Sequence, residues 1–99
     1  MNDKDGVLLR VNANLWRGRE AVGGRLTLTR DCLSFRAHAL NIQTEPLDLP
    51  LGHIASVQKY NHLRIIPNGL SVTTTSGAVF HFVLFKRDRI VAAIEASRL

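Results

Sequence analysis

A chain of 99 residues has room for one folded domain with one hydrophobic core. Hydrophobic residues make up 45% of it and charged residues 21%, which is typical of a folded domain and excludes a disordered tail or a collagen-like repeat. The single cysteine, Cys32, excludes an internal disulfide framework, and no apolar run reaches the roughly 20 residues of a membrane-spanning helix. The net charge of +5 favours anionic partners such as lipids, nucleic acids or acidic proteins.

The domain boundaries follow from the same features. We expect a single domain over residues 1–99, with residues 1–6 as a flexible N-terminus. The opening "MNDKDG" is polar and mixed in charge, and no apolar segment typical of a signal peptide follows it. Together with the lone cysteine, this predicts a cytoplasmic protein.

Alternation of apolar and polar residues predicts strands along most of the chain. After a first strand that ends near Trp16, such strands are expected in segments 25–29, 32–37, 45–51, 53–57, 70–75 and 79–85. The side chains expected to face inward are Leu26, Leu28, Leu33, Phe35, Ala37, Leu47, Leu49, Leu51, Leu70, Val72, Thr74, Phe80, Phe82 and Leu84.

Turn-forming residues separate these strands. In "IPNG", Pro67 presets φ at the second turn position, Asn68 suits the third, and Gly69 accepts a positive φ, which predicts a type I turn with a bulge. Shorter connections are indicated by Thr29–Asp31, by Pro50 with Gly52, and by Ser76–Gly77.

The last segment, 86–99, changes to a helical period. Ile90, Val91 and Ile94 form an apolar stripe while Arg87 faces away, and Asp88 favours the positive end of the helix. The stripe is expected to cover one opening of the sheet, the alternative being a groove for a partner. The fold class is therefore mainly β: about seven strands in two near-orthogonal antiparallel sheets or a partly open barrel, followed by a C-terminal α-helix.

The stretch "WRGREAVGGR" (16–25) holds the candidate binding residues. In a meander, this connection and the one after residue 37 lie at the same end of the barrel, so several cations are expected to form one basic cup. Arginine suits phosphate because its fork of donors matches paired oxygens. The residues expected in this anion-binding or lipid-binding cup are Arg17, Arg19, Arg25, Arg36 and His38.

A plainer interpretation of the same stretch stays open. Gly23 and Gly24 then provide a bulge or a close approach of strands, and the arginines are solvated or paired with Glu20. Trp16 either dips into a bilayer interface, where tryptophan is favoured, or belongs to the core or its rim.

Other chemistries lack a supporting pattern. Cys32 lies in a strand far in sequence from His81, and neither a GxSxG nor a P-loop motif is present, so we do not expect an enzyme. The four histidines lack the spacing of metal ligands, so no metal and no cofactor are expected. Nucleic acid is disfavoured because aromatic residues make up only 6% of the chain.

A set of short segments in order along the chain resembles a GRAM domain. They are "ANLW" (13–16), "GGRLTLT" (23–29), "LSFRAH" (33–38), "KYN" (59–61), "IIPNGL" (65–70) and "FVLFKR" (82–87). The resemblance runs from about Val7 to the end and implies a pleckstrin-homology-like (PH-like) fold. The chain departs from the family pattern at Lys86, where asparagine is frequent, and at Ile90, where an aromatic residue is frequent.

The resemblance implies an intracellular module that binds membrane lipids or proteins. We therefore expect a non-enzymatic domain, peripheral to a membrane, that recognises anionic phospholipid headgroups through the basic 16–25 connection. The alternative is a protein-interaction or self-association module that uses a sheet edge or the terminal helix, and that alternative leaves a homo-oligomer open.

Overall fold

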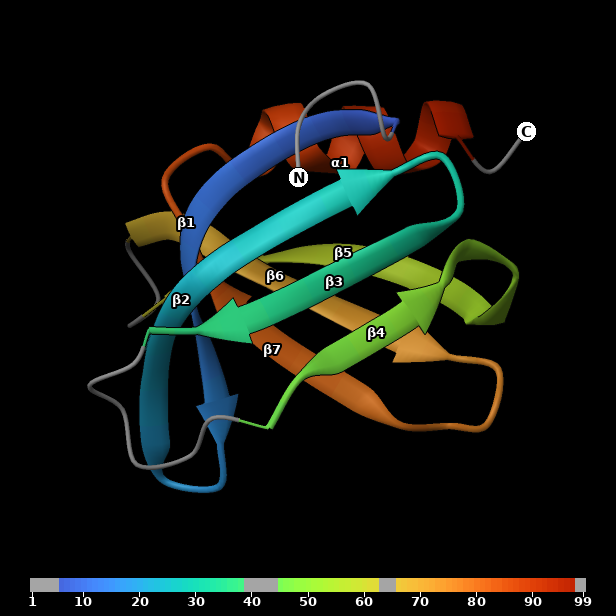
Figure 1. Cartoon of the computed structure of the whole chain (residues 1–99). Coiled ribbons are helices and arrows are strands. Elements are labelled where there is room, and N and C mark those ends of the chain that lie inside the picture. Colours follow the sequence, from blue (N-terminus) through green and yellow to red (C-terminus); the bar gives the residue numbers. More distant parts are fainter. Residues whose placement is uncertain (1–5, 39–44, 63–65, 98–99) are drawn as a thin grey trace.

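The computed structural model describes residues 6–38, 45–62 and 66–97, so the expected flexible N-terminus lies outside the described residues except for Gly6. Within these ranges, seven antiparallel strands follow one another as a meander, and a helix ends the chain (Figure 1). The elements are β1 (Val7–Arg17), β2 (Glu20–Thr29), β3 (Cys32–Ala37), β4 (Leu47–Pro50), a short 3-10 helix (Leu51–His53), β5 (Ile54–His62), β6 (Ile66–Thr74), β7 (Val79–Val83) and α1 (Arg87–Ser97).

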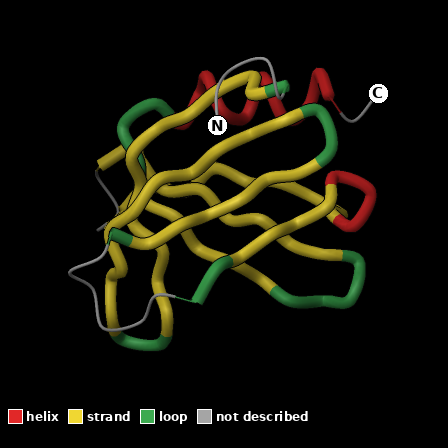
Figure 2. The backbone as a smooth tube through the Cα atoms, viewed as in Figure 1, coloured by secondary structure: helices red, strands yellow, loops and turns green. Residues whose placement is uncertain are grey.

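The strands form one hydrogen-bonded sheet in the order β4-β3-β2-β1-β7-β6-β5. The strand β1 lies at its centre and pairs with both β2 and β7, and the bent sheet curls into a barrel whose two edges are β4 and β5 (Figure 2). Figure 2 shows the bend of β1 and β2, the crossing of the two strand layers, and α1 lying across one end. The predicted fold, a barrel of crossing antiparallel layers with a C-terminal helix, is confirmed.

The interior is filled by the side chains that the alternation predicts to face inward. Phe35 and Phe82 form its aromatic centre, with ring centroids 6.0 Å apart. Ala37, Leu47 and Phe80 pack against the core and are only partly buried. The period of two therefore determines which face of each strand is left for the solvent.

The helix closes the barrel with its apolar stripe. Ile90 and Ile94 have no exposed surface, so this face is not free for a partner. The expectation that Arg87 faces away is wrong, since only 13% of its side chain is exposed. Its Nη1 donates to the carbonyl oxygens of Tyr60 at 2.7 Å and Gly69 at 3.2 Å, because carbonyl groups covered by the helix need donors.

The predicted turn at Pro67, Asn68 and Gly69 is also wrong, because all three residues lie within β6. The carbonyl oxygen of Asn68 accepts a hydrogen bond from the backbone N–H of Leu84 at 2.9 Å. Extended pairing on both sides of β6 has thus overridden the local turn propensity. By contrast, Gly77 lies in the β6–β7 turn with a φ of +93°, where the sequence predicts a turn.

The stretch 16–25 is mostly strand rather than loop. Only Gly18 and Arg19 form the β1–β2 turn, and Gly18 has a φ of +63°. Gly23 and Gly24 are not turn residues but belong to β2. A Cβ on Gly24 would lie 2.4 Å from the carbonyl oxygen of Arg36 and 2.6 Å from the Phe35 ring, so this glycine serves a close approach of strands, which was one of its two interpretations.

Candidate functional site

The β1–β2 hairpin and the connection after β3 lie at the same end of the barrel, as the meander predicts. Arg17 demonstrates it: its Nη2 donates to the carbonyl oxygen of Glu45 at 2.7 Å, and its Nη1 lies 3.6 Å from the Glu45 carboxylate. Only 21% of the Arg17 side chain is exposed. Much of its charge is thus engaged within the protein, and residues 39–44 of the connection lie outside the described residues.

Three other predicted residues lie at this hairpin end. Trp16 stands on the outer face of β1 and is 36% exposed, which places it at the rim rather than in the core. Arg19 is exposed in the turn, and His38 is exposed beside Gly23, whose carbonyl oxygen accepts its backbone N–H at 3.0 Å. The hairpin end therefore presents Trp16, Arg19 and His38 to the solvent.

Arg25 and Arg36 do not join this group. They lie opposite each other on β2 and β3, on the outer face of the sheet. Arg25 is about 17 Å along β2 from its first residue, since each residue of a strand rises by about 3.3 Å. The expected single cup of five residues is therefore divided into a hairpin group and a mid-sheet group.

Arg36 has a partner within the mid-sheet group. Its Nη2 lies 3.0 Å from a carboxylate oxygen of Asp48, and its Nη1 donates to the carbonyl oxygens of Phe35 and Leu47. A hydrogen bond from Ser34 and the Arg36 guanidinium hold the pKa of Asp48 below its usual value. Arg36 is thus partly neutralised.

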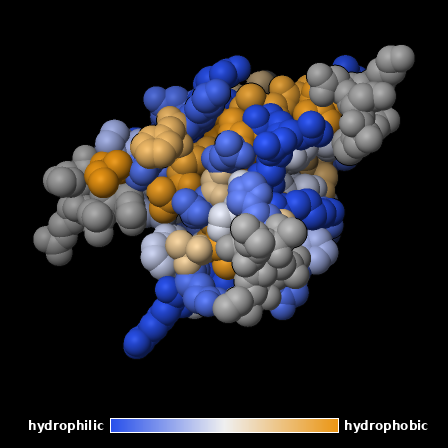
Figure 3. Space-filling model, turned by 60° about the vertical axis from the view of Figure 1, so that its left-hand side comes forward, coloured by the Kyte–Doolittle hydropathy of each residue, from blue (hydrophilic) through white to orange (hydrophobic). Residues whose placement is uncertain are grey.

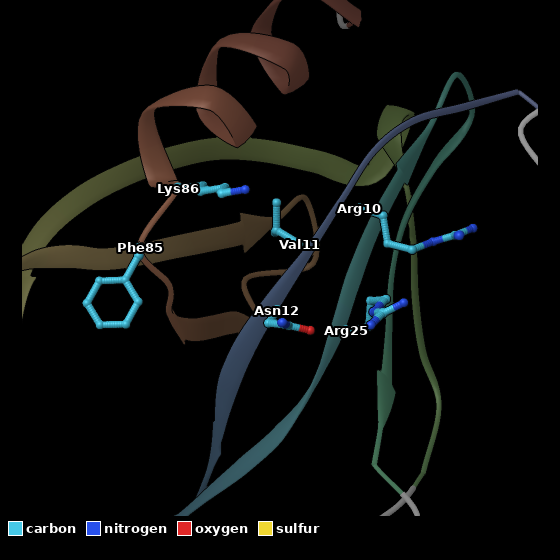
Figure 4. A pocket seen from close by; sticks show the side chains of 6 residues that line it. All are labelled: Arg10, Val11, Asn12, Arg25, Phe85 and Lys86. Carbon is cyan, nitrogen blue, oxygen red and sulfur yellow. The ribbon is translucent and has the colours of Figure 1, made fainter.

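Arg25 instead lines a cleft on the outer surface, shown in Figure 4, with a volume of about 390 Å³. Arg10 and Arg25 extend in the same direction from β1 and β2, and Lys86 reaches towards β1 from the start of α1. We call this cleft the basic cleft; its lining residues are Arg10, Val11, Asn12, Arg25, Phe85 and Lys86.

The register of the sheet explains why two arginines meet there. Asn12 is directly opposite Arg25, and Arg10 is opposite Thr27, so Arg10 and Arg25 are diagonal neighbours on adjacent strands. A further hollow of about 370 Å³ begins at the same two arginines and extends over the hydroxyl groups of β2 and β3 to Arg36. Arg10 and Arg25 therefore stand between two hollows that are rich in hydrogen-bond donors.

Their charges are not balanced within the described parts of the chain. Neither Arg10, Arg25 nor Lys86 has a carboxylate within 4.0 Å among the described residues. Asp88, two residues from Lys86, instead pairs with Lys59 at 2.6 Å, and that hydrogen bond with its charge lowers the pKa of Asp88. Like charges close together without a counter-ion repel each other, so a bound anion would relieve this repulsion.

The basic cleft contains four residues that are not among the binding residues expected from the sequence: Arg10, Asn12, Phe85 and Lys86. The period of two could have placed Arg10 and Asn12 outward on the first strand. Lys86 carried a signal of its own, because it departs from the family pattern. These four residues lie near Arg25 because of the strand register and the position of α1. A local sequence pattern reveals neither of these.

Comparison with protein-family models assigns the chain to a family. A family model described as GRAM domain matches residues 1–96. This protein is a GRAM domain. Comparison of the GRAM domain with curated proteins gives no significant match.

Solved structures similar to this GRAM domain share its fold. The C-terminal domain of an unknown protein from Leishmania infantum superposes with a TM-score of 0.81 at 17% identity, over 93% of this chain and 83% of that one. The Slm1-PH domain in complex with inositol-4-phosphate has a TM-score of 0.66 at 11% identity, over 94% and 95%. The same domain in complex with phosphoserine has a TM-score of 0.66 at 11% identity, over 93% and 92%. The fold is therefore PH-like.

GRAM domains are generally non-enzymatic binding modules. The described residues of this GRAM domain include no helix with the length and apolar character needed to cross a bilayer.

Proposed function

We propose that this GRAM domain binds the phosphate-bearing headgroups of anionic membrane phospholipids at the basic cleft. The observation that carries the proposal is the pair Arg10 and Arg25, which project together and have no carboxylate partner among the described residues. Each guanidinium can donate two parallel hydrogen bonds to phosphate oxygens, and the Lys86 ammonium adds a third cation.

Two further features support this assignment. Asn12, opposite Arg25, supplies a neutral amide that can donate to a phosphate or a headgroup hydroxyl. Slm1-PH, which has the same fold, was crystallised with inositol-4-phosphate and with phosphoserine, so the architecture accommodates phosphorylated ligands in that protein.

The hairpin end is a weaker candidate for the same contact. Arg17 is engaged by Glu45, which leaves Arg19 as the exposed arginine of this end, with the exposed imidazole of His38 beside it. Trp16 is 36% exposed at the same end, and we keep these residues as a secondary contact that Arg19→Gln tests directly.

The protein-interaction alternative has less support. The helix stripe is covered, because Ile90 and Ile94 are fully buried. Of the two sheet edges, β4 has four residues and ends in Pro50, and short edges with proline are poor templates for strand addition, so this alternative depends on the nine-residue edge strand β5.

Co-sedimentation with vesicles tests the proposal. Neutral phosphatidylcholine vesicles are compared with vesicles that also contain phosphatidylserine or a phosphoinositide, at low and high salt. We expect binding only to the anionic vesicles and a loss of binding as salt screens the contact. Arg10→Gln and Arg25→Gln should each weaken it by about fivefold, equal to about 1 kcal/mol per cation near an anionic surface.

Arg30→Gln is the matched control, because Arg30 is exposed in the β2–β3 turn and lines neither hollow. An effect of Arg30→Gln as large as that of Arg25→Gln would show that the protein binds by general charge attraction and not at the basic cleft. Absence of binding to all anionic vesicles would exclude the proposed function.

A further inference from the structure

One large apolar side chain beside the basic cleft has no role in the packing of the barrel. Phe85 is 91% exposed, whereas the other exposed large hydrophobic residues in the described part of the chain, Leu8, Trp16 and Val79, are 46%, 36% and 48% exposed. Figure 4 shows its ring clear of the surrounding strands and helix. Burial of a phenylalanine is strongly favourable, so such exposure marks a surface that a partner covers.

The backbone on both sides of Phe85 is anchored. Leu84 is 2% exposed, and its N–H donates to the carbonyl oxygen of Asn68 at 2.9 Å. The carbonyl oxygen of Lys86 accepts the N–H groups of Arg89 and Ile90 in the first turn of α1. With the preceding side chain in the core and the following carbonyl in the helix, Phe85 is held outward at the β7–α1 junction.

The surroundings of Phe85 combine apolar and cationic groups. It lines the same cleft as Arg10, Arg25 and Lys86, and Leu8 stands on the outer face of β1 next along from Arg10. Figure 3, which turns the side with β1 and the start of α1 forward, shows hydrophobic and hydrophilic side chains intermixed on this face. An anionic bilayer has phosphates at its surface and acyl chains beneath them. The cations around Phe85 suit the phosphate layer, and the aromatic ring suits the boundary with the acyl chains.

We propose that the GRAM domain docks on anionic membranes with its β7–α1 junction towards the bilayer, so that Phe85 penetrates the interface while the basic cleft holds headgroup phosphates. This orientation rests on the proposed function. It differs from docking through the hairpin end, because Trp16 lies about 20 Å along β1 from Arg10 and the strand bends around the barrel between them (Figure 1).

The chain provides its own reporter for the two orientations, since Trp16 is its single tryptophan. The wild-type protein reports on the hairpin end, and the double variant Trp16→Phe with Phe85→Trp reports on the junction. We expect the emission of the residue-85 reporter to shift to the blue with phosphatidylcholine–phosphatidylserine vesicles and to be quenched by brominated lipids. The Trp16 emission should stay unchanged.

The substitution Phe85→Ala provides a test by vesicle affinity. It should not disturb the fold, because the ring is exposed. We expect vesicle affinity to fall by about tenfold, the cost of leaving an aromatic ring unburied. Val79→Ala, an exposed apolar residue of β7 outside the cleft, should leave it unchanged. The rise in melting temperature caused by soluble inositol phosphate in the wild type tests the basic cleft separately from the bilayer contact, since that ligand has no acyl chain.

Four results would overturn the orientation. A blue shift of Trp16 without one at residue 85 would place the hairpin end in the bilayer. Vesicle binding with neither reporter shifted would mean contact with headgroups alone. An effect of Val79→Ala equal to that of Phe85→Ala would mean unspecific apolar attraction. Stabilisation by a phosphoserine peptide without any vesicle binding would point to a phosphoprotein partner and would also exclude the proposed function.

Discussion

The role of Gly69 in the structure differs from the role that the sequence predicts. The sequence predicts that Gly69 closes a turn, yet Gly69 lies in β6 against the ring of Tyr60. A Cβ at this position would lie 2.4 Å from Cε2 of that ring, closer than side chains pack. Gly69 is thus required for the space it leaves rather than for its backbone freedom, and only the tertiary contact with β5 reveals the reason.

The substitution Gly69→Ala should destabilise the fold by about 1–3 kcal/mol, the usual cost of overpacking a filled interior. Chemical denaturation measured by tryptophan fluorescence checks it. Gly52→Ala is the control, because a Cβ on Gly52 has no atom within 4 Å and should change the free energy of unfolding little. Equal stability of the two variants would show that the Tyr60 ring moves aside without cost.

At the scale of elements, α1 does more than cover the barrel with an apolar face. The period of the apolar residues predicted the helix, and Ile90 and Ile94 bear it out. The helix is also held at its first residue, because Arg87 donates hydrogen bonds to the carbonyl oxygens of Tyr60 on β5 and Gly69 on β6. A charged residue at a helix start is ordinarily solvated, so the sequence alone favoured the opposite orientation.

Replacing Arg87 by methionine keeps the apolar stem but removes the donors. The two carbonyl groups then lose their partner, and we expect a loss of about 1–3 kcal/mol in the free energy of unfolding. Arg89→Met is the matched control on the exposed side of the same helix turn. Hydrogen exchange of β5 and β6 amides should rise in the first variant alone; a similar rise in both would assign the effect to helix propensity.

For the whole molecule, the sequence predicts the fold better than the site. Alternation in "RLTLT" and "VFHFVLF" determines which side chains enter the core, and this is local information. Arg10 and Arg25 are separated by fourteen residues in the chain and meet only through the register of β1 and β2. Lys86 comes from the other end of the sequence, so the basic cleft is a property of the assembled barrel.

The clustered charge of the cleft should cost the whole domain some stability. We expect the melting temperature to rise by a few degrees between about 20 mM and about 300 mM salt, because screening weakens repulsion within a chain of net charge +5. Arg25→Gln should raise the low-salt melting temperature by about 1–3 °C and reduce its salt dependence, whereas Arg30→Gln should have a smaller effect. A lower melting temperature of Arg25→Gln would show that Arg25 stabilises the fold.

The β1–β2 hairpin extends past its neighbours. In the described residues β1 pairs with β7 only through Asn14 and Leu15, and β2 pairs with β3 only from Gly24 onward. The tip around Gly18 is thus a two-stranded arm that projects beyond the paired strands of the barrel. A peptide epitope or fluorophore grafted there would leave the barrel and the basic cleft intact, and would label the domain at a position outside the cleft.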